Sequence, residues 1–237
     1  MGGADWLDGL LGFRCCRVQT PARIGSPLIK IVGRVAWLIT PVLVAGLGQV
    51  AILRTGHLGR LAVPLDFGWY WRAKPVLGPR KTWRGVIVMT TVAALTARAQ
   101  AVAARRSRRL RAINPFDYER VNPWLLGSAL GLGYCIAELP NSFVKRRLGI
   151  PPTHTSSRFQ YLVDQSDSVI GCLTALRFFY KPTRTETSVA FATGLGVHIA
   201  VDRLMHALGV KHRDSYRLSQ MMPSTLATTG TARLSRP

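Results

Sequence analysis

The hydrophobic residues of this chain gather into five long stretches, separated by segments rich in Arg, Lys, Pro and Gly. The first stretch, residues 35–53, carries no charge and is long enough to cross the ~30 Å hydrocarbon core of a bilayer as a helix. Extending it back to Ile31 adds only Arg34, whose side chain can reach the membrane surface. The predicted spans are residues 31–53, 85–104, 121–144, 163–180 and 187–208. The pattern predicts an all-α, polytopic integral membrane protein with about five transmembrane helices; a soluble helical bundle with buried core helices is the alternative.

Composition supports the membrane interpretation. The chain is 48% hydrophobic, yet it carries 32 Lys and Arg residues against 11 Asp and Glu residues, for a formal net charge of +21. A disordered basic tail is excluded, because disorder requires low hydrophobicity. A nucleic-acid binder would present a basic soluble face with aromatic residues, and Trp69, Tyr70 and Trp71 lie among basic residues. Beside apolar spans, these aromatic side chains are better interpreted as interfacial, and we expect no nucleic-acid partner.

The spans divide the chain into three parts. These are an N-terminal segment (1–30), a membrane-embedded domain (31–210) and a C-terminal tail (211–237) that we expect to be disordered. Five spans place the loops 54–84 and 145–162 on the same side as the tail. That side carries slightly more Lys and Arg than the other, so the positive-inside rule predicts that it is cytoplasmic.

Three of the few acidic residues lie in or at the edge of apolar spans on that predicted cytoplasmic side: Glu138, Asp164 and Asp167. A carboxylate in a span costs roughly 2.5–3.5 kcal/mol on insertion scales, so it normally has a partner. Asp164 and Asp167 share one face of a helix, where two carboxylates repel each other unless a cation or a basic group lies between them. Oxygen ligands of this kind suit Mg²⁺, which also bridges to substrate phosphates. Helix-capping acids at the membrane edge are the alternative.

Basic and hydroxyl side chains lie at the same predicted membrane edge. Lys81, Thr82 and Arg84 directly precede or begin the second span, and the third span ends in the segment 141–147, Asn-Ser-Phe-Val-Lys-Arg-Arg. Such groups can form a phosphate site, or they can simply bind lipid headgroups. A P-loop is excluded, because Arg80 and Pro75 occupy the positions where its glycines are required.

Three segments together resemble the CDP-archaeol synthases, integral-membrane CTP transferases related to the phosphatidate cytidylyltransferases. The segments are 64–68 with 77–85, 138–148, and 164–171. Where the family usually has Gly-Asp, this chain has Ala137-Glu138, which keeps the carboxylate but lengthens its reach. The resemblance implies a bilayer-embedded pocket open to the cytoplasm at the cell membrane, with Mg²⁺, CTP and a phosphorylated membrane lipid as its ligands.

The resemblance also assigns roles to particular residues. CTP-dependent cytidylyl transfer to the lipid phosphate would release pyrophosphate and form the CDP-activated lipid. The expected metal ligands are Glu138, Asp164 and Asp167. The expected catalytic residues are Asp164, Asp167 and Lys145. The expected substrate-binding residues are Lys81, Thr82, Arg84, Asn141, Ser142, Arg146 and Gln165.

Two matters stay open at the level of sequence. Asp66, in the first matching segment, suits either a structural turn-capping role or a role in the site. The whole chain could alternatively be a non-catalytic or transporting membrane protein, whose acids and bases form ion pairs between helices. The sequence does not distinguish ether from ester lipids, and it does not define the oligomeric state.

Overall fold

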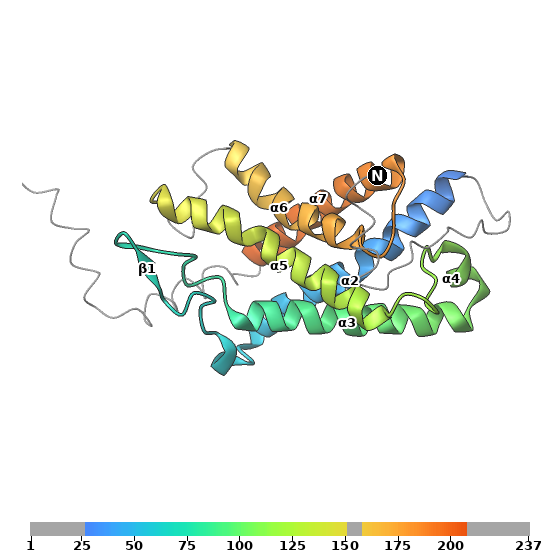
Figure 1. The fold of residues 1–237 in the computed structure, drawn as a ribbon, viewed down its shortest axis with the longest axis horizontal. Helices are drawn as coiled ribbons and strands as arrows, with labels where there is room; N and C mark the ends of the chain where they lie inside the picture. Colours follow the sequence, from blue (N-terminus) through green and yellow to red (C-terminus); the bar gives the residue numbers. More distant parts are fainter. Residues whose placement is uncertain (1–26, 151–157, 208–237) are drawn as a thin grey trace, which may run out of the picture.

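The computed structural model describes residues 27–150 and 158–207, and its fold is mainly helical (Figure 1). Five long helices form the bundle: α2 (Pro27–Thr55), α3 (Trp83–Arg106), α5 (Pro123–Arg147), α6 (Arg158–Leu176) and α7 (Arg184–Ala207). They correspond to the five predicted apolar stretches, which confirms the predominantly helical fold class. The N-terminal segment before residue 27 and the predicted tail lie outside the described residues.

Shorter elements connect the long helices. A 3₁₀ turn, η1 (Gly59–Leu61), follows α2, and the helix α4 (Arg108–Ile113) follows α3. Between η1 and α3 lies a small antiparallel hairpin of β1 (Tyr70–Trp71) and β2 (Lys74–Pro75). The hairpin projects from one end of the bundle, at the left of Figure 1. The hydrophobic pattern predicted none of these short elements.

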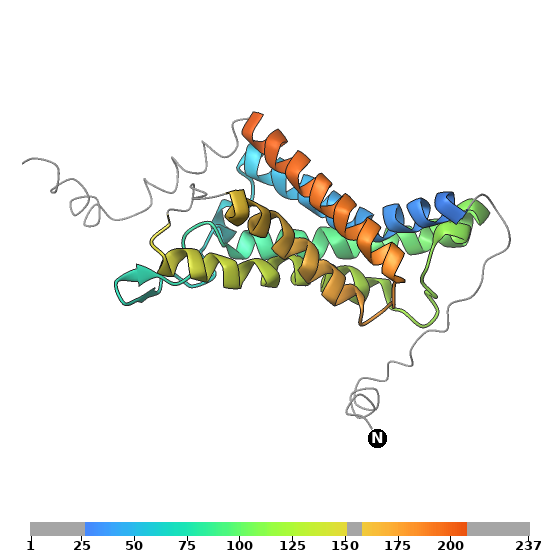
Figure 2. The same ribbon diagram turned by 90° about the horizontal axis from the view of Figure 1, so that it is seen from above.

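Small residues allow α5 to pack closely on its neighbours. Gly127 and Gly131 of α5 face α3, and a Cβ atom on Gly131 would lie only 2.7 Å from the carbonyl oxygen of Met89. Gly133 faces α6 in the same way, 2.7 Å from the carbonyl oxygen of Gly171. Glycines spaced four residues apart are typical of close helix contacts in membranes. Figure 2 shows α7 running beside α2, and α5 packs between α3 and α6.

Apolar side chains also cover the outside of the bundle. Two helices, α2 over Leu28–Thr55 and α3 over Trp83–Arg106, are long and apolar enough to cross a membrane. Large hydrophobic residues are nonetheless exposed on all five long helices; examples are Leu47, Leu95, Ile136, Ile170 and Leu204. An apolar surface that surrounds the bundle is unusual for a soluble monomer and suits a lipid environment.

The loop 56–82 is shaped by hydrogen bonds within the loop and is attached to the bundle by a contact with the end of α5. Asp66 accepts hydrogen bonds from the backbone N–H groups of Gly68, Leu77 and Gly78, at 3.1, 2.7 and 3.1 Å. Asp66 is therefore a turn-capping residue, one of the two roles that the sequence allowed. Farther along, the strand-like bridge between Pro64 and Thr82 closes the loop at the start of α3.

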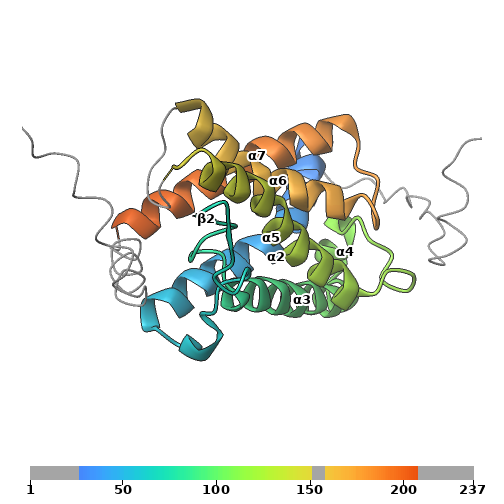
Figure 3. The same cartoon turned by 60° about the vertical axis from the view of Figure 1, so that its left-hand side comes forward.

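Arg147, at the end of α5, attaches the hairpin to that helix. Its guanidinium donates hydrogen bonds to the carbonyl oxygens of Trp71, Lys74 and Pro75, at 2.5, 3.0 and 2.6 Å. It also lies over the rings of Trp71 and Phe143, which stack on each other. Lys74 completes the contact by donating to the carbonyl oxygen of Arg147 at 2.7 Å. The hairpin is thereby fixed to the end of α5 (Figure 3).

Candidate functional site

The predicted acids and bases meet at the end of the bundle that carries the hairpin. Lys81 comes from the loop before α3, whereas Glu138 and Lys145 lie on the last turns of α5. Asp164 and Asp167 lie on α6, which packs antiparallel against this part of α5. The helical spacing places Glu138 and Lys145 on one side of α5, and it places Asp164 and Asp167 on one face of α6, so the charged sides of the two helices can meet.

Two ion pairs organise the charges. Lys81 pairs with Glu138, and Lys145 pairs with Asp164. The side chains are partly exposed, between 16% and 26% of their surface, so they remain accessible from outside the protein. Burial alone lowers the pKa of Lys81, but attraction to Glu138 and Asp167 outweighs that effect and raises the pKa above its ordinary value. Lys81 is therefore a permanent cation at neutral pH.

Two neutral side chains link the carboxylates to one another. The amide nitrogen of Asn141 donates to Asp164 at 2.7 Å and to Asp167 at 2.9 Å. The hydroxyl of Ser168, which is fully buried, lies 2.8 Å from a Glu138 oxygen and 3.0 Å from an Asp167 oxygen. All three predicted acids thus belong to one polar network, together with Asn141 and both lysines. Ser168 was not predicted, although it follows Asp164 by one helical turn and therefore shares its face.

A cavity of about 330 Å³ opens beside this network, between α2, α5 and the start of α3. Lys81, Thr82, Arg84 and Glu138 line it. Thr82 is the N-cap of α3, with its hydroxyl 3.3 Å from the N–H of Gly85, and the first turn of α3 contains no acidic residue. The positive end of the helix dipole and two basic side chains therefore face the cavity without an acid in that turn. Such a surface is suited to an anion.

The remaining predicted substrate ligands have other partners in this structure. Ser142 donates its hydroxyl to the carbonyl oxygen of Glu138 at 2.9 Å. Arg146 is buried and packs against Gly78, where a Cβ atom would lie 3.4 Å from its Cδ atom. Gln165 is buried as well, and its side-chain oxygen lies 2.5 Å from Nδ1 of His198. Their direct contact with substrate stays a prediction.

The donor set fits Mg²⁺ through its two aspartates. One N–H₂ group of Asn141 lies between oxygens of Asp164 and Asp167, so a cation at that place would meet two hard carboxylate ligands. One or two carboxylates plus substrate phosphates are the usual ligands of Mg²⁺. Within residues 27–150 and 158–207, no three His, Cys, Asp or Glu side chains are grouped closely enough to hold a metal ion by themselves. The role of Glu138 as a third ligand stays a prediction.

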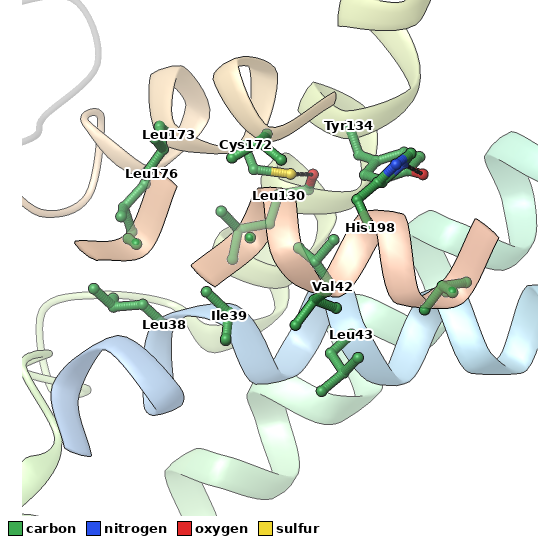
Figure 4. Close-up of a pocket in the computed structure, with 16 residues that line it drawn as sticks. Leu38, Ile39, Val42, Leu43, Leu130, Tyr134, Cys172, Leu173, Leu176 and His198 are labelled. Carbon is green, nitrogen blue, oxygen red and sulfur yellow. Dashed lines mark hydrogen bonds between the residues drawn. The ribbon is translucent and has the colours of Figure 1, made fainter. Parts of the chain in front are cut away.

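A second, apolar pocket of about 100 Å³ lies between α2, α5, α6 and α7 (Figure 4). Leu38 and Val42 of α2 face Leu173 and Leu176 of α6 across it. A polar pair closes the end nearest the charged network. There the Tyr134 hydroxyl lies 2.6 Å from Nε2 of His198, and Nδ1 of His198 contacts the side-chain oxygen of Gln165. Tyr134 lines both pockets, so it separates the charged cavity from the apolar one.

The fold and the site together define a helical bundle with exposed apolar side chains and, at one end, a polar site suited to an anion. Comparison with known proteins gives the family. A family model described as CarS-like, CDP-archaeol synthase, matches residues 28–214, and the chain belongs to this family.

Two known proteins illustrate the similarity. A CDP-archaeol synthase of Pyrococcus furiosus is 32% identical over 117 residues, which are 49% of this chain and 60% of that protein. The chain therefore matches about three fifths of the length of this curated relative. A solved structure described as an intramembrane enzyme for archaeal membrane lipid biosynthesis has a TM-score of 0.52 and 24% identity. The match covers 70% of this chain and 91% of that one, and it shows that the fold is shared.

Proposed function

We propose that this protein is a CTP-dependent cytidylyltransferase that converts a phosphorylated membrane lipid to its CDP-activated form. One observation carries the proposal: the Lys81–Glu138 and Lys145–Asp164 pairs meet Asn141 and Asp167 beside a cavity suited to an anion. Family membership supplies the reaction class.

The reaction requires positioning and charge neutralisation rather than a covalent intermediate. An oxygen of the lipid phosphate attacks the α-phosphorus of CTP, and the bond to pyrophosphate breaks. Lys81 and Arg84 offset charge on the triphosphate from the α3 side, while Lys145 does so from the α5 side. Asn141 holds the two aspartates in register. Asp164 and Asp167, with Glu138 as the predicted third ligand, would hold Mg²⁺, which stabilises negative charge on phosphate oxygens when bound.

The location suits both substrates. We infer that all five long helices span the cell membrane and that the charged end faces the cytoplasm. Exposed apolar residues on every long helix support this arrangement. CTP would then arrive from water, the lipid phosphate would lie at the interface, and the two would meet at the helix ends.

The direct test uses the full chain purified in detergent, with CTP, MgCl₂ and either an ether-linked or an ester-linked lipid phosphate. We expect a CDP-lipid and pyrophosphate in equal amounts, and omission of Mg²⁺ should abolish both. Product from only one of the two lipids would define the lipid class. No product from either lipid, in a preparation that is folded by its thermal transition, would contradict the proposed function.

A further inference from the structure

The charged cavity contains a polar side chain that the reaction as described does not use. Gln49 belongs to the apolar helix α2, where Thr40 satisfies its own hydroxyl by donating to the carbonyl oxygen of Ala36 at 2.6 Å. The side-chain oxygen of Gln49 is buried, and within residues 27–150 and 158–207 no group donates a hydrogen bond to it. A buried acceptor without a donor is costly, and a polar residue in a candidate span is a functional-site hypothesis by default.

The position of Gln49 relates it to the substrates. It lines the same cavity as Lys81, Arg84 and Glu138. Gly85 lies opposite, and a Cβ atom there would be 3.6 Å from the amide nitrogen of Gln49, so the amide lies beside the first turn of α3. Arg84 is 9% exposed, and its Nε–H group has no acceptor in the part of the chain that the structure describes. The cavity therefore presents a buried acceptor and a buried donor that no described residue satisfies.

The two substrates differ in what they can offer to these groups. An ionised lipid phosphate presents acceptor oxygens only, so it can satisfy Arg84 but not the oxygen of Gln49. A cytidine nucleotide presents acceptors on its phosphates and also the donor N4 amine of its base. Uracil carries an acceptor oxygen at that position instead. Of the two substrates, the base of the nucleotide complements Gln49.

We propose that this cavity receives the nucleotide, and that Gln49 is a specificity residue whose oxygen accepts a hydrogen bond from the cytosine N4 amine. The amide nitrogen of Gln49 can donate to N3 of the same base, which gives a two-point contact. This inference rests on the proposed function for the identity of the nucleotide. In the observed orientation of its amide, with the nitrogen beside Gly85 and the oxygen unpaired among the described residues, Gln49 favours cytosine over uracil.

The test compares CTP with UTP as substrates of the full chain in detergent, at a saturating concentration of lipid phosphate. In Gln49→Leu, a substitution of similar size, we expect the CTP-over-UTP ratio of kcat/KM to fall at least about tenfold, mostly through KM for CTP. Gln49→Glu keeps an acceptor for the N4 amine but loses the donor to N3, and its carboxylate can also accept from N3–H of uracil, so the ratio should fall as well. An unchanged ratio in either Gln49→Leu or Gln49→Glu would overturn the proposal.

A matched control and a binding measurement separate the possible failures. Gln100 of α3 donates to the carbonyl oxygen of Trp37 at 2.9 Å, outside the cavity. Gln100→Leu should lower Tm yet keep the ratio. The increase in Tm on adding CTP, compared with that on adding UTP, reports binding without turnover. The difference between the two increases should be smaller in Gln49→Leu. If turnover is absent but this thermal preference depends on Gln49, the inference stands and the proposed reaction fails. If turnover occurs with a ratio independent of Gln49, the inference alone fails.

Discussion

The two ends of the helix bundle both contain acid–base pairs, but they treat those charges differently. At the end opposite the hairpin, Glu186 of α7 is 2% exposed and pairs with Arg34 of α2 at 3.1 Å. Its other oxygen accepts from the hydroxyl of Tyr180 at 2.9 Å and from the backbone N–H of Thr183 at 2.9 Å. Every oxygen of this carboxylate therefore has a protein donor.

The hairpin end leaves hydrogen-bonding capacity unused. Its paired lysines and acids are partly exposed, and buried atoms of Gln49, Arg84 and Arg146 lack partners among the described residues. At the Glu186 end the carboxylate is buried and fully paired, although Nε of Arg34 lacks a partner among the described residues, and such a pair fixes helices to each other. At the hairpin end the ion pairs are accessible and retain capacity for a ligand. The Glu186–Arg34 pair is the kind of interhelical ion pair expected for a non-catalytic membrane protein. That alternative accounts for this end of the molecule only.

The largest expected effect comes from removing charge at the hairpin end. In Asp167→Asn, the side chain keeps its size but loses the charge that a cation requires, so kcat for CDP-lipid formation should fall on the order of a hundredfold or more. Tm should change little, because Asp167 is not part of either ion pair. Steady-state rates and a thermal melt measure the two properties separately.

Asp117→Asn is the matched control for that substitution. Asp117 lies in the loop before α5, where it pairs with Arg120 at the surface. The Asp117→Asn protein should retain full activity. Full activity in Asp167→Asn would remove the functional distinction between the two ends.

At the opposite end, the same kind of change should affect stability and leave the chemistry intact. Glu186→Gln removes one partner of a buried pair and leaves Arg34 uncompensated, which costs about 3 kcal/mol. The corresponding fall in Tm is roughly 6–12 °C for a chain of this size. Below the lowered transition, kcat/KM should match that of the unsubstituted protein, and Glu119→Gln in the exposed loop should change neither property. A kcat/KM loss comparable to that of Asp167→Asn would mean that the Glu186 end participates in the reaction.

The sequence predicted the long elements because apolar periodicity and length depend only on local composition. It did not predict the hairpin, because its turn residues Arg72 and Ala73 adopt φ values of 51° and 59°, where Asn and Gly are usual. It predicted the acids of the site, since a carboxylate in an apolar stretch is conspicuous. It missed the Glu186–Arg34 pair, whose partners are 152 positions apart, and it missed Gln49, whose significance depends on a cavity formed by other helices.

Arg147 lies at the hairpin end and both stabilises the fold and supports the site. Its substitution should have the smallest effect of those considered. Its hydrogen bonds to three hairpin carbonyls make it structural, yet the loop that it holds leads to Lys81. Arg147→Lys keeps the charge but loses the planar fork, so the hairpin should loosen and KM for CTP should rise roughly three- to tenfold with kcat nearly unchanged. Arg72→Lys, on the same hairpin, should leave KM unchanged. A fall in kcat with constant KM would instead indicate that Arg147 contacts the reacting phosphates, as part of the unsaturated site rather than its support.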